Sequence, residues 1–280
     1  MASDLAFVLI NPYTIAKSRT GGVIGRFISR TGLDLVAARM FAPGAELIAR
    51  YAEQVERDPG GDPAGRALLA DYVRRAYAPD AVSGRRRRVL MILLEGEDAI
   101  EKVRDMAGPV TMGGGETIRD TFGDYVVDEN RQVRYFEPAV LIGTTRESAG
   151  AALRLWSEYA VSDGGLLQAT VDHSPQDAGW QRTLVLIKPD NFRFPSAKPG
   201  NIIDVLSRSG LRILAAKVHR MSVAQAEEFY GPVRQVLREK MKQRVAEKAG
   251  HCLEAEFGVT VPPPVVAMLE REHEPMGERL

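Results

Sequence analysis

The sequence has a single cysteine, no net charge and no long apolar run. Cys252 is the only cysteine among 280 residues, which excludes an internal disulfide and favours a reducing compartment. Lysine plus arginine and aspartate plus glutamate both number 37, so the formal net charge is zero. This balance predicts neither nucleic acid as the main partner nor an acidic solvating tail.

Signals for membranes and for export are missing as well. The apolar runs have the length of strands, far below the roughly 20 residues of a membrane span, so we expect no membrane partner. The segment Met1–Leu5 lacks the basic start and the apolar core of a signal peptide. A hydrophobic content of 45% is ordinary for globular proteins, and 280 residues suffice for about two domains. We therefore expect a cytoplasmic protein of two domains.

An internal repeat supports this division. The apolar run Phe7–Ile10 is followed by Asn11-Pro12, and the same pattern returns about 177 residues later as Leu184–Ile187 followed by Lys188-Pro189. Since solenoid repeats are roughly 20–50 residues long, a period of this size indicates a duplicated domain. The apolar positions agree, but a lysine of the second copy is an asparagine in the first. This pattern predicts a retained fold with an altered site.

Hydrophobic periodicity predicts the elements of each copy. The first copy has expected strands over 5–10, 33–40, 89–94, 122–127 and 133–142, and expected helices ending at Gly32 and over 45–55, 64–77, 98–106 and 149–159. The second copy has expected strands over 183–187, 211–219 and 265–270, and helices over 200–208 and 223–249. We assign a domain to residues 1–160, a linker to 161–180 and a partial domain to 181–280.

Several of these segments resemble one known family. Those that resemble the N-terminal half of nucleoside diphosphate kinases are Thr183–Asp190, Gly210–Lys217 and Ser222–Tyr230. Those that resemble the C-terminal half are Val89–Glu97, Arg104 and Thr117–Phe122. The resemblance implies an α+β fold, a ferredoxin-like βαββαβ antiparallel sheet with helices on one face, present in duplicate. The strand and helix order derived above is the same.

The resemblance also implies a reaction and its residues. Members of this family move a γ-phosphoryl group from a nucleoside triphosphate to a diphosphate through a phosphohistidine, with Mg²⁺ accompanying the nucleotide. Transferred position by position, it implies a nucleotide- or phosphate-binding role for six residues. They are Tyr51, Arg104, Thr111 and Arg119 in the first copy, and Lys188 and Tyr230 in the second.

The catalytic positions of the first copy have changed. Ile142 occupies the position of the phosphohistidine, and an isoleucine has no lone pair that could accept a phosphoryl group. Ala139 and Ala152 replace the asparagine and the histidine-orienting glutamate, and Asn11 replaces the lysine. Thr144 carries an unactivated hydroxyl, which is a poor nucleophile. We therefore expect a pseudo-enzyme without a catalytic residue, with residual binding of a nucleotide or polyphosphate.

Two alternatives stay open. In a longer natural chain the second domain would be completed and would act as an active kinase that uses Lys188 and Tyr230. In the other, the chain is a structural or assembly module without a ligand, because the resemblance implies a homo-oligomer. We predict no metal site of the protein's own, and Mg²⁺ only together with a nucleotide. The run Arg85–Arg88 could attract an anion, but a charged edge or a solvated face is the better interpretation.

Overall fold

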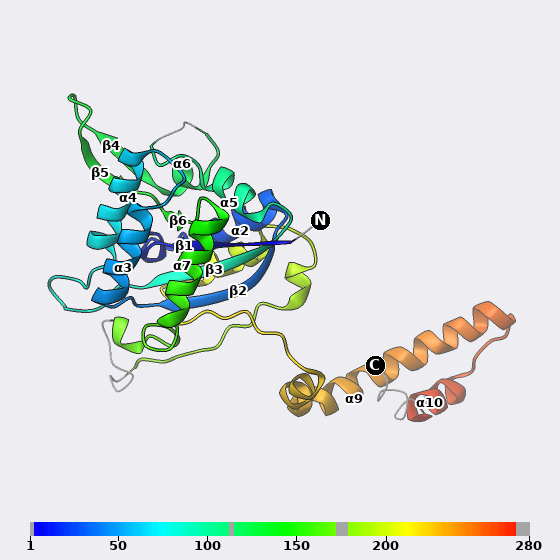
Figure 1. Ribbon diagram of the computed structural model, residues 1–280. Helices are drawn as coiled ribbons and strands as arrows, with labels where there is room; N and C mark the ends of the chain where they lie inside the picture. Colours follow the sequence, from blue (N-terminus) through cyan, green and yellow to red (C-terminus); the bar gives the residue numbers. More distant parts are fainter. Residues whose placement is uncertain (1–2, 112–114, 172–178, 273–280) are drawn as a thin grey trace. The chain divides into compact units, whose positions relative to one another are not determined.

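The computed structural model describes residues 3–111, 115–171 and 179–272. The chain packs as two units, Met1–Val218 and His219–Leu280, and each is described by itself (Figure 1). The first unit holds the whole first copy of the repeat and the beginning of the second. The domain limits expected at 160 and 181 stay a prediction, and residues 172–178 of the expected linker lie outside the described residues.

A four-stranded sheet forms the centre of the first unit. Its strands are β1 (Asp4–Ile10), β2 (Asp34–Phe41), β3 (Val89–Gly96) and β6 (Val140–Ile142), in the order β2-β3-β1-β6. All neighbours are antiparallel, with Ile10 of β1 opposite both Leu90 and Val140. Two strand–helix–strand connections thus interleave in one antiparallel sheet. The predicted ferredoxin-like α+β fold is confirmed for the first copy.

Helices cover both faces of this sheet, so the expectation of helices on one face was wrong. They are α1 (Pro12–Ala16), α2 (Thr20–Thr31), α3 (Ala45–Glu56), α4 (Pro63–Ala76), α5 (Ala99–Ala107) and α7 (Arg146–Glu158). The cluster that contains Val8 packs under α2 and α5, whereas the cluster that contains Leu9 packs under α3, α4 and α7. Residues 6–10 of β1 are buried without interruption, because a strand covered on both faces is apolar at every position.

The segment before β6 departs from the predicted strands. Residues 118–122 form the short helix α6 (Ile118–Phe122), and β4 (Asp124–Val127) pairs with β5 (Val133–Glu137) in a separate two-stranded sheet. This hairpin projects from the central sheet in Figure 1. The single strand expected over 133–142 is divided after Glu137, because Pro138 cannot donate to a ladder and Ala139 has a φ of 60°.

The beginning of the second copy adds helices but no strand to the first unit. Its elements are η1 (Gln168–Thr170), η2 (Pro189–Phe192) and α8 (Lys198–Arg208). Residues 183–187 and 211–219, expected as strands, pair with no described strand. Helix α8 packs on α2, where Asp204 accepts a hydrogen bond from the backbone N–H of Gly21 at 2.8 Å. A Cβ atom on Gly200 would lie 2.1 Å from the carbonyl oxygen of Gly21, so this helix contact requires glycine.

The second unit consists of two described helices. The long helix α9 (Val223–Phe257) begins with a capping box between Ser222 and Gln225 and ends at Gly258 in the left-handed conformation. Helix α10 (Pro263–Glu272) occupies the place of the strand expected over 265–270, and that prediction was wrong. Prolines at the first turn favour a helix start, and no described strand is available to pair there. Throughout the described residues, no helix combines the length and the apolar content that crossing a bilayer requires.

Candidate functional site

Position 142 lies on β6, at the edge of the four-stranded sheet, and its side chain carries no reactive group. Ile142 pairs with Val8 of β1, is 9% exposed, and belongs to the apolar cluster under α2 and α5. Ala139 is fully buried, and its carbonyl oxygen accepts hydrogen bonds from the backbone N–H of Asn11 and the hydroxyl of Thr14. Ala152 packs in the other cluster. The positions that the resemblance assigns to nucleophile, asparagine and glutamate therefore contribute to the core.

Arg119 lies on α6, where the main chain holds its guanidinium group. Thr117 caps this helix by accepting from the backbone N–H of Asp120. Arg119 donates through Nη1 to the carbonyl oxygen of Gly108 and through Nη2 to that of Val140 at 3.5 Å. Burial lowers its pKa to about 10, and its Nε is buried with no hydrogen-bond partner among the described residues. The guanidinium group remains a cation at neutral pH.

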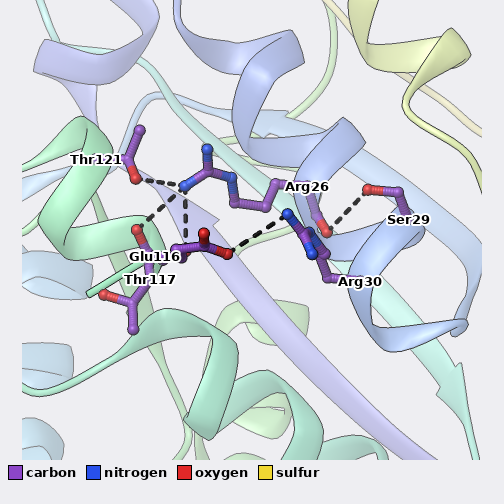
Figure 2. A network of polar contacts seen from close by, with 6 residues as sticks. All are labelled: Arg26, Ser29, Arg30, Glu116, Thr117 and Thr121. Carbon is purple, nitrogen blue, oxygen red and sulfur yellow. Dashed lines mark hydrogen bonds and ion pairs between the residues drawn. The ribbon is translucent and has the colours of Figure 1, made fainter.

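Arg26 on α2 fixes the segment that carries Arg119 (Figure 2). Its Nη1 donates to the carbonyl oxygens of Glu116, at 3.2 Å, and of Thr117, at 3.4 Å, and to the hydroxyl of Thr121. One guanidinium group thus satisfies acceptors on both sides of the start of α6. A helix of five residues has little stability of its own, so such tertiary contacts set its position.

Tyr51 is a second predicted site residue, and it interacts electrostatically with Arg119. It is buried on α3 and packs edge-to-face on Trp156, with ring centroids 5.3 Å apart. Its hydroxyl has no hydrogen-bond partner among the described residues. Burial is the main cause that raises its pKa, followed by the negative charge of Asp58, whereas Arg119 lowers it. These electrostatic interactions place the three side chains in one environment.

Asp58 ties the connection between α3 and α4 to the end of β6, which sequence reasoning missed. Its Oδ1 accepts from the hydroxyl of Thr144 at 2.6 Å and from the backbone N–H of Gly60 at 2.9 Å. A Cβ atom on Gly60 would lie 2.0 Å from Oγ1 of Thr144, so the close approach needs glycine. The turn-forming sequence around Asp58 was visible in the sequence, but its partner lies 86 residues away.

Asn11, which replaces the lysine, belongs to a closed network. Its Oδ1 accepts from the hydroxyl of Tyr77 at 2.8 Å, and its Nδ2 donates to Oε1 of Glu137 at 3.5 Å. The hydroxyl of Tyr72 donates to both oxygens of Glu137, at 2.6 and 2.8 Å. Burial raises the pKa of Glu137, although the hydrogen bond from Tyr72 lowers it. The family's cationic position is thus neutral and sealed from solvent in this chain.

A cavity of about 310 Å³ adjoins Arg119. Thr111 lies on its rim as an exposed residue, so the structure brings two of the predicted site residues together. The lining also contains the carboxyl groups of Asp120, Asp124 and Glu137, so the lining holds more acidic side chains than basic ones. Within the described part of the chain, no group of three or more histidine, cysteine, aspartate or glutamate residues is suited to hold a metal ion.

The other predicted site residues lie elsewhere. Arg104 is exposed on α5, where it forms ion pairs with Glu101 and Asp105, both at 3.4 Å, and it lines neither described cavity. Lys188 is an exposed residue directly before η2. Tyr230 is a half-exposed residue of α9 that packs edge-to-face on Phe229, and it belongs to the second unit. Their assigned binding roles stay predictions.

Solved structures similar to this chain are nucleoside diphosphate kinases. The enzyme of Aquifex aeolicus is 22% identical, with a TM-score of 0.40, over 55% of this chain and 95% of that one. The Borrelia burgdorferi enzyme, solved as a transition-state mimic with vanadate and ADP, is 18% identical, with a TM-score of 0.42, over 62% of this chain and 94% of that one.

Sequence comparisons identify the family. The family model for nucleoside diphosphate kinase matches residues 181–246. The nucleoside diphosphate kinase of Staphylothermus marinus is 50% identical over 50 residues, which are 18% of this chain and 34% of the relative. That of Burkholderia mallei is 34% identical over 129 residues, which are 45% of this chain and 79% of the relative. This chain belongs to the nucleoside diphosphate kinase family.

Proposed function

We propose that this chain is a pseudo-enzyme of its family, which does not transfer a phosphoryl group through histidine and retains weak binding of a nucleoside di- or triphosphate beside Arg119. The observation that carries the proposal is a pair of buried donors, the hydroxyl of Tyr51 and Nε of Arg119, without a partner among the described residues. Buried donors are nearly always satisfied, and phosphate oxygens are strong acceptors for arginine.

The loss of transfer follows from the core position of Ile142. Covalent phosphoryl transfer needs a nucleophile with a lone pair and a group that activates it. In place of these the β6 strand carries an apolar side chain packed in the core. The nearby hydroxyl of Thr144 donates to Oδ1 of Asp58 at 2.6 Å, and the proposed loss concerns transfer through histidine alone.

Magnesium enters this proposal only with the nucleotide. Mg²⁺ is usually bound by one or two carboxylates together with substrate phosphates rather than by an all-protein cage. Asp120 and Asp124 in the cavity lining provide carboxylates of this kind, and a Mg²⁺ ion held between them and the nucleotide would offset the repulsion between the acidic lining and a polyphosphate.

Incubation with γ-labelled ATP tests the loss of transfer. We expect no acid-labile, base-stable phosphoprotein, and stoichiometric labelling of this type would contradict the proposal. Thermal unfolding with ADP and with ATP, each with and without Mg²⁺, tests binding.

The variants Arg119→Ala and Thr111→Ala should abolish or reduce the stabilisation by nucleotide, whereas Arg134→Ala, an exposed residue outside the cavity, should preserve it. Thr111 is exposed, so Thr111→Ala should fold like the parent protein, and a weaker stabilisation by nucleotide would then report lost binding. If nucleotide does not stabilise the parent protein and sizing shows a defined oligomer, the assembly module replaces this proposal.

A further inference from the structure

The larger cavity of the first unit has no role in the proposed function. Its volume is about 550 Å³, within the roughly 300–1,000 Å³ of small-molecule sites. It shares Phe136 and Glu137 with the cavity beside Arg119 and opens between α1, the end of α4 and the segment before β3. The arginines of its lining are Arg75, Arg85, Arg86, Arg87 and Arg88. The arginine run expected to be a charged edge therefore borders a cavity.

Carboxylates of the lining do not balance these arginines. Besides Glu137, whose oxygens accept from Tyr72, the lining has one acidic residue, Asp80. Oδ1 of Asp80 accepts from the backbone N–H groups of Val82 and Ser83 and from the Ser83 hydroxyl, at 3.1, 2.9 and 3.0 Å. Its other oxygen lies 3.5 Å from Nη2 of Arg87. Asp80 thus closes its own turn and also forms an ion pair with Arg87.

Two of the arginines brace the wall of the cavity. Nη1 of Arg86 donates to the carbonyl oxygen of Ala42 at 2.9 Å and to Oδ1 of Asp163 at 3.0 Å. Arg88 donates to the carbonyl oxygen of Ile213. These contacts fix the backbone of the segment before β3. Arg87, which lies between the two anchored arginines, therefore has a defined position at the cavity.

Of the other three arginines, Arg75 and Arg87 each form an ion pair with an aspartate whose side chain is at least 43% exposed. Arg75 pairs with Asp71 one turn earlier on α4, at 2.7 Å, and the side chains of this pair are 62% and 55% exposed. Exposed pairs of this kind contribute about 0–1 kcal/mol, so an anion with several charges can displace the aspartates. Tyr13 and Tyr135, which also line the cavity, interact through a side-chain hydrogen bond and add hydroxyl groups.

We propose that this cavity binds a small, multiply phosphorylated anion, with Arg75 and Arg87 as its main contacts. A guanidinium group can donate two parallel N–H bonds to the oxygens of one phosphate group, and two such groups from different segments line this cavity. This site does not depend on the nucleotide site proposed beside Arg119.

Calorimetric titration with inorganic tripolyphosphate, at constant ionic strength and without Mg²⁺, tests the proposal. We expect saturable binding to the parent protein and at least a tenfold loss of affinity in the double variant Arg75→Gln/Arg87→Gln. The matched control is Arg57→Gln/Arg134→Gln, which removes the same charge from exposed, ion-paired arginines outside both cavities and should change affinity by less than twofold. Equal losses in the two double variants, or no binding to the parent, would overturn the proposal.

Arg119→Ala separates this site from the nucleotide site. Tripolyphosphate binding that persists in Arg119→Ala and disappears in Arg75→Gln/Arg87→Gln supports two separate sites. Binding that disappears only in Arg119→Ala overturns this inference and leaves the proposed function intact. A single-stranded oligonucleotide that binds more tightly than tripolyphosphate, with a steeper dependence on salt, would also overturn it, because the ligand would then be a phosphodiester chain.

Discussion

The same apolar run occurs twice in this chain, once as a central strand and once without a strand partner. Residues 7–10 lie in β1, paired with β3 on one side and with β6 on the other, and they are buried. Leu184, Val185 and Leu186 are 77%, 45% and 49% exposed and pair with no described strand. Yet the family model matches the second copy, over residues 181–246.

The difference shows that a strand depends on its partners more than on its own sequence. The first copy supplies β3, which pairs with β1 along its whole length, and β6, which pairs with residues 8–10. In the second copy, the segment expected as the third strand forms α10 in the other unit. The copy that the family model matches therefore forms no sheet among its described residues, whereas in the copy with the sheet the resemblance assigns the nucleophile position to Ile142.

The largest effect should come from truncating the equivalent leucines of the two runs. Leu9→Ala removes a fully buried side chain from β1 and should lower the free energy of unfolding by about 2–5 kcal/mol. Leu186→Ala, at the equivalent exposed position, should change it by less than about 0.5 kcal/mol. Urea denaturation measures both. Equal losses would mean that the second run is buried in a sheet in solution.

Exchanging the polar residues that follow these runs should give the next largest effect. Asn11→Lys places a longer, charged side chain in the closed network with Tyr77 and Glu137, and should destabilise by about 2–3 kcal/mol. Lys188→Asn, at an exposed position, should be nearly neutral. Thermal and urea unfolding of the two variants compare them. A stable Asn11→Lys protein would show that the first copy can still accommodate the family's cation.

A smaller effect on stability should follow from adding one methyl group where α8 of the second copy packs on α2 of the first. Gly200→Ala would place a Cβ atom against the carbonyl oxygen of Gly21, so α8 must shift from α2 at a cost of about 1–2 kcal/mol. Gly231→Ala, within α9 with no atom near its Cβ position, should be neutral or stabilising because alanine favours helices. Urea denaturation again provides the measurement. If both variants match the parent protein, the contact between α2 and α8 does not contribute to stability.

The smallest effect concerns pH. Burial raises the pKa of Glu137 above its ordinary 4.5, so the folded protein holds this proton more tightly than the unfolded chain. The stabilisation that comes from the protonated Glu137 carboxyl group is therefore complete below about pH 4.5. It is lost as the pH rises through the raised pKa. Glu137→Gln cannot titrate, so its stability relative to the parent should increase from pH 4.5 to 7. A stability difference between Glu137→Gln and the parent protein that does not depend on pH would refute the prediction.

The first copy could be predicted from the sequence because its elements are signalled locally. The run that ends at Asn11-Pro12 and the left-handed cap at Gly32 are visible in a few neighbouring residues, and both appear as expected. The second copy has the same local signals, but strand pairing is decided by residues far along the chain. Local patterns therefore predicted strands there that the structure does not form.

The site was predictable only in part, for the same reason. The resemblance identified Tyr51 and Arg119, which the structure brings into one environment. It could not reveal that Asp58 binds Thr144, or that Tyr72 binds Glu137, because these pairs are 86 and 65 residues apart. Asn11 is buried against Tyr77 and Glu137, which lie far from it in the sequence, so local patterns could not predict its burial.

The contact between α2 and α8 joins helices that occupy equivalent places in the two copies. A twofold dimer presents the same surface from both subunits, so any substitution alters both sides of the contact together. In this chain the two sides are encoded separately, and the first contributes Gly21 and Gly25 while the second contributes Gly200 and Asp204. Each side can therefore change by single substitutions that the other side does not share.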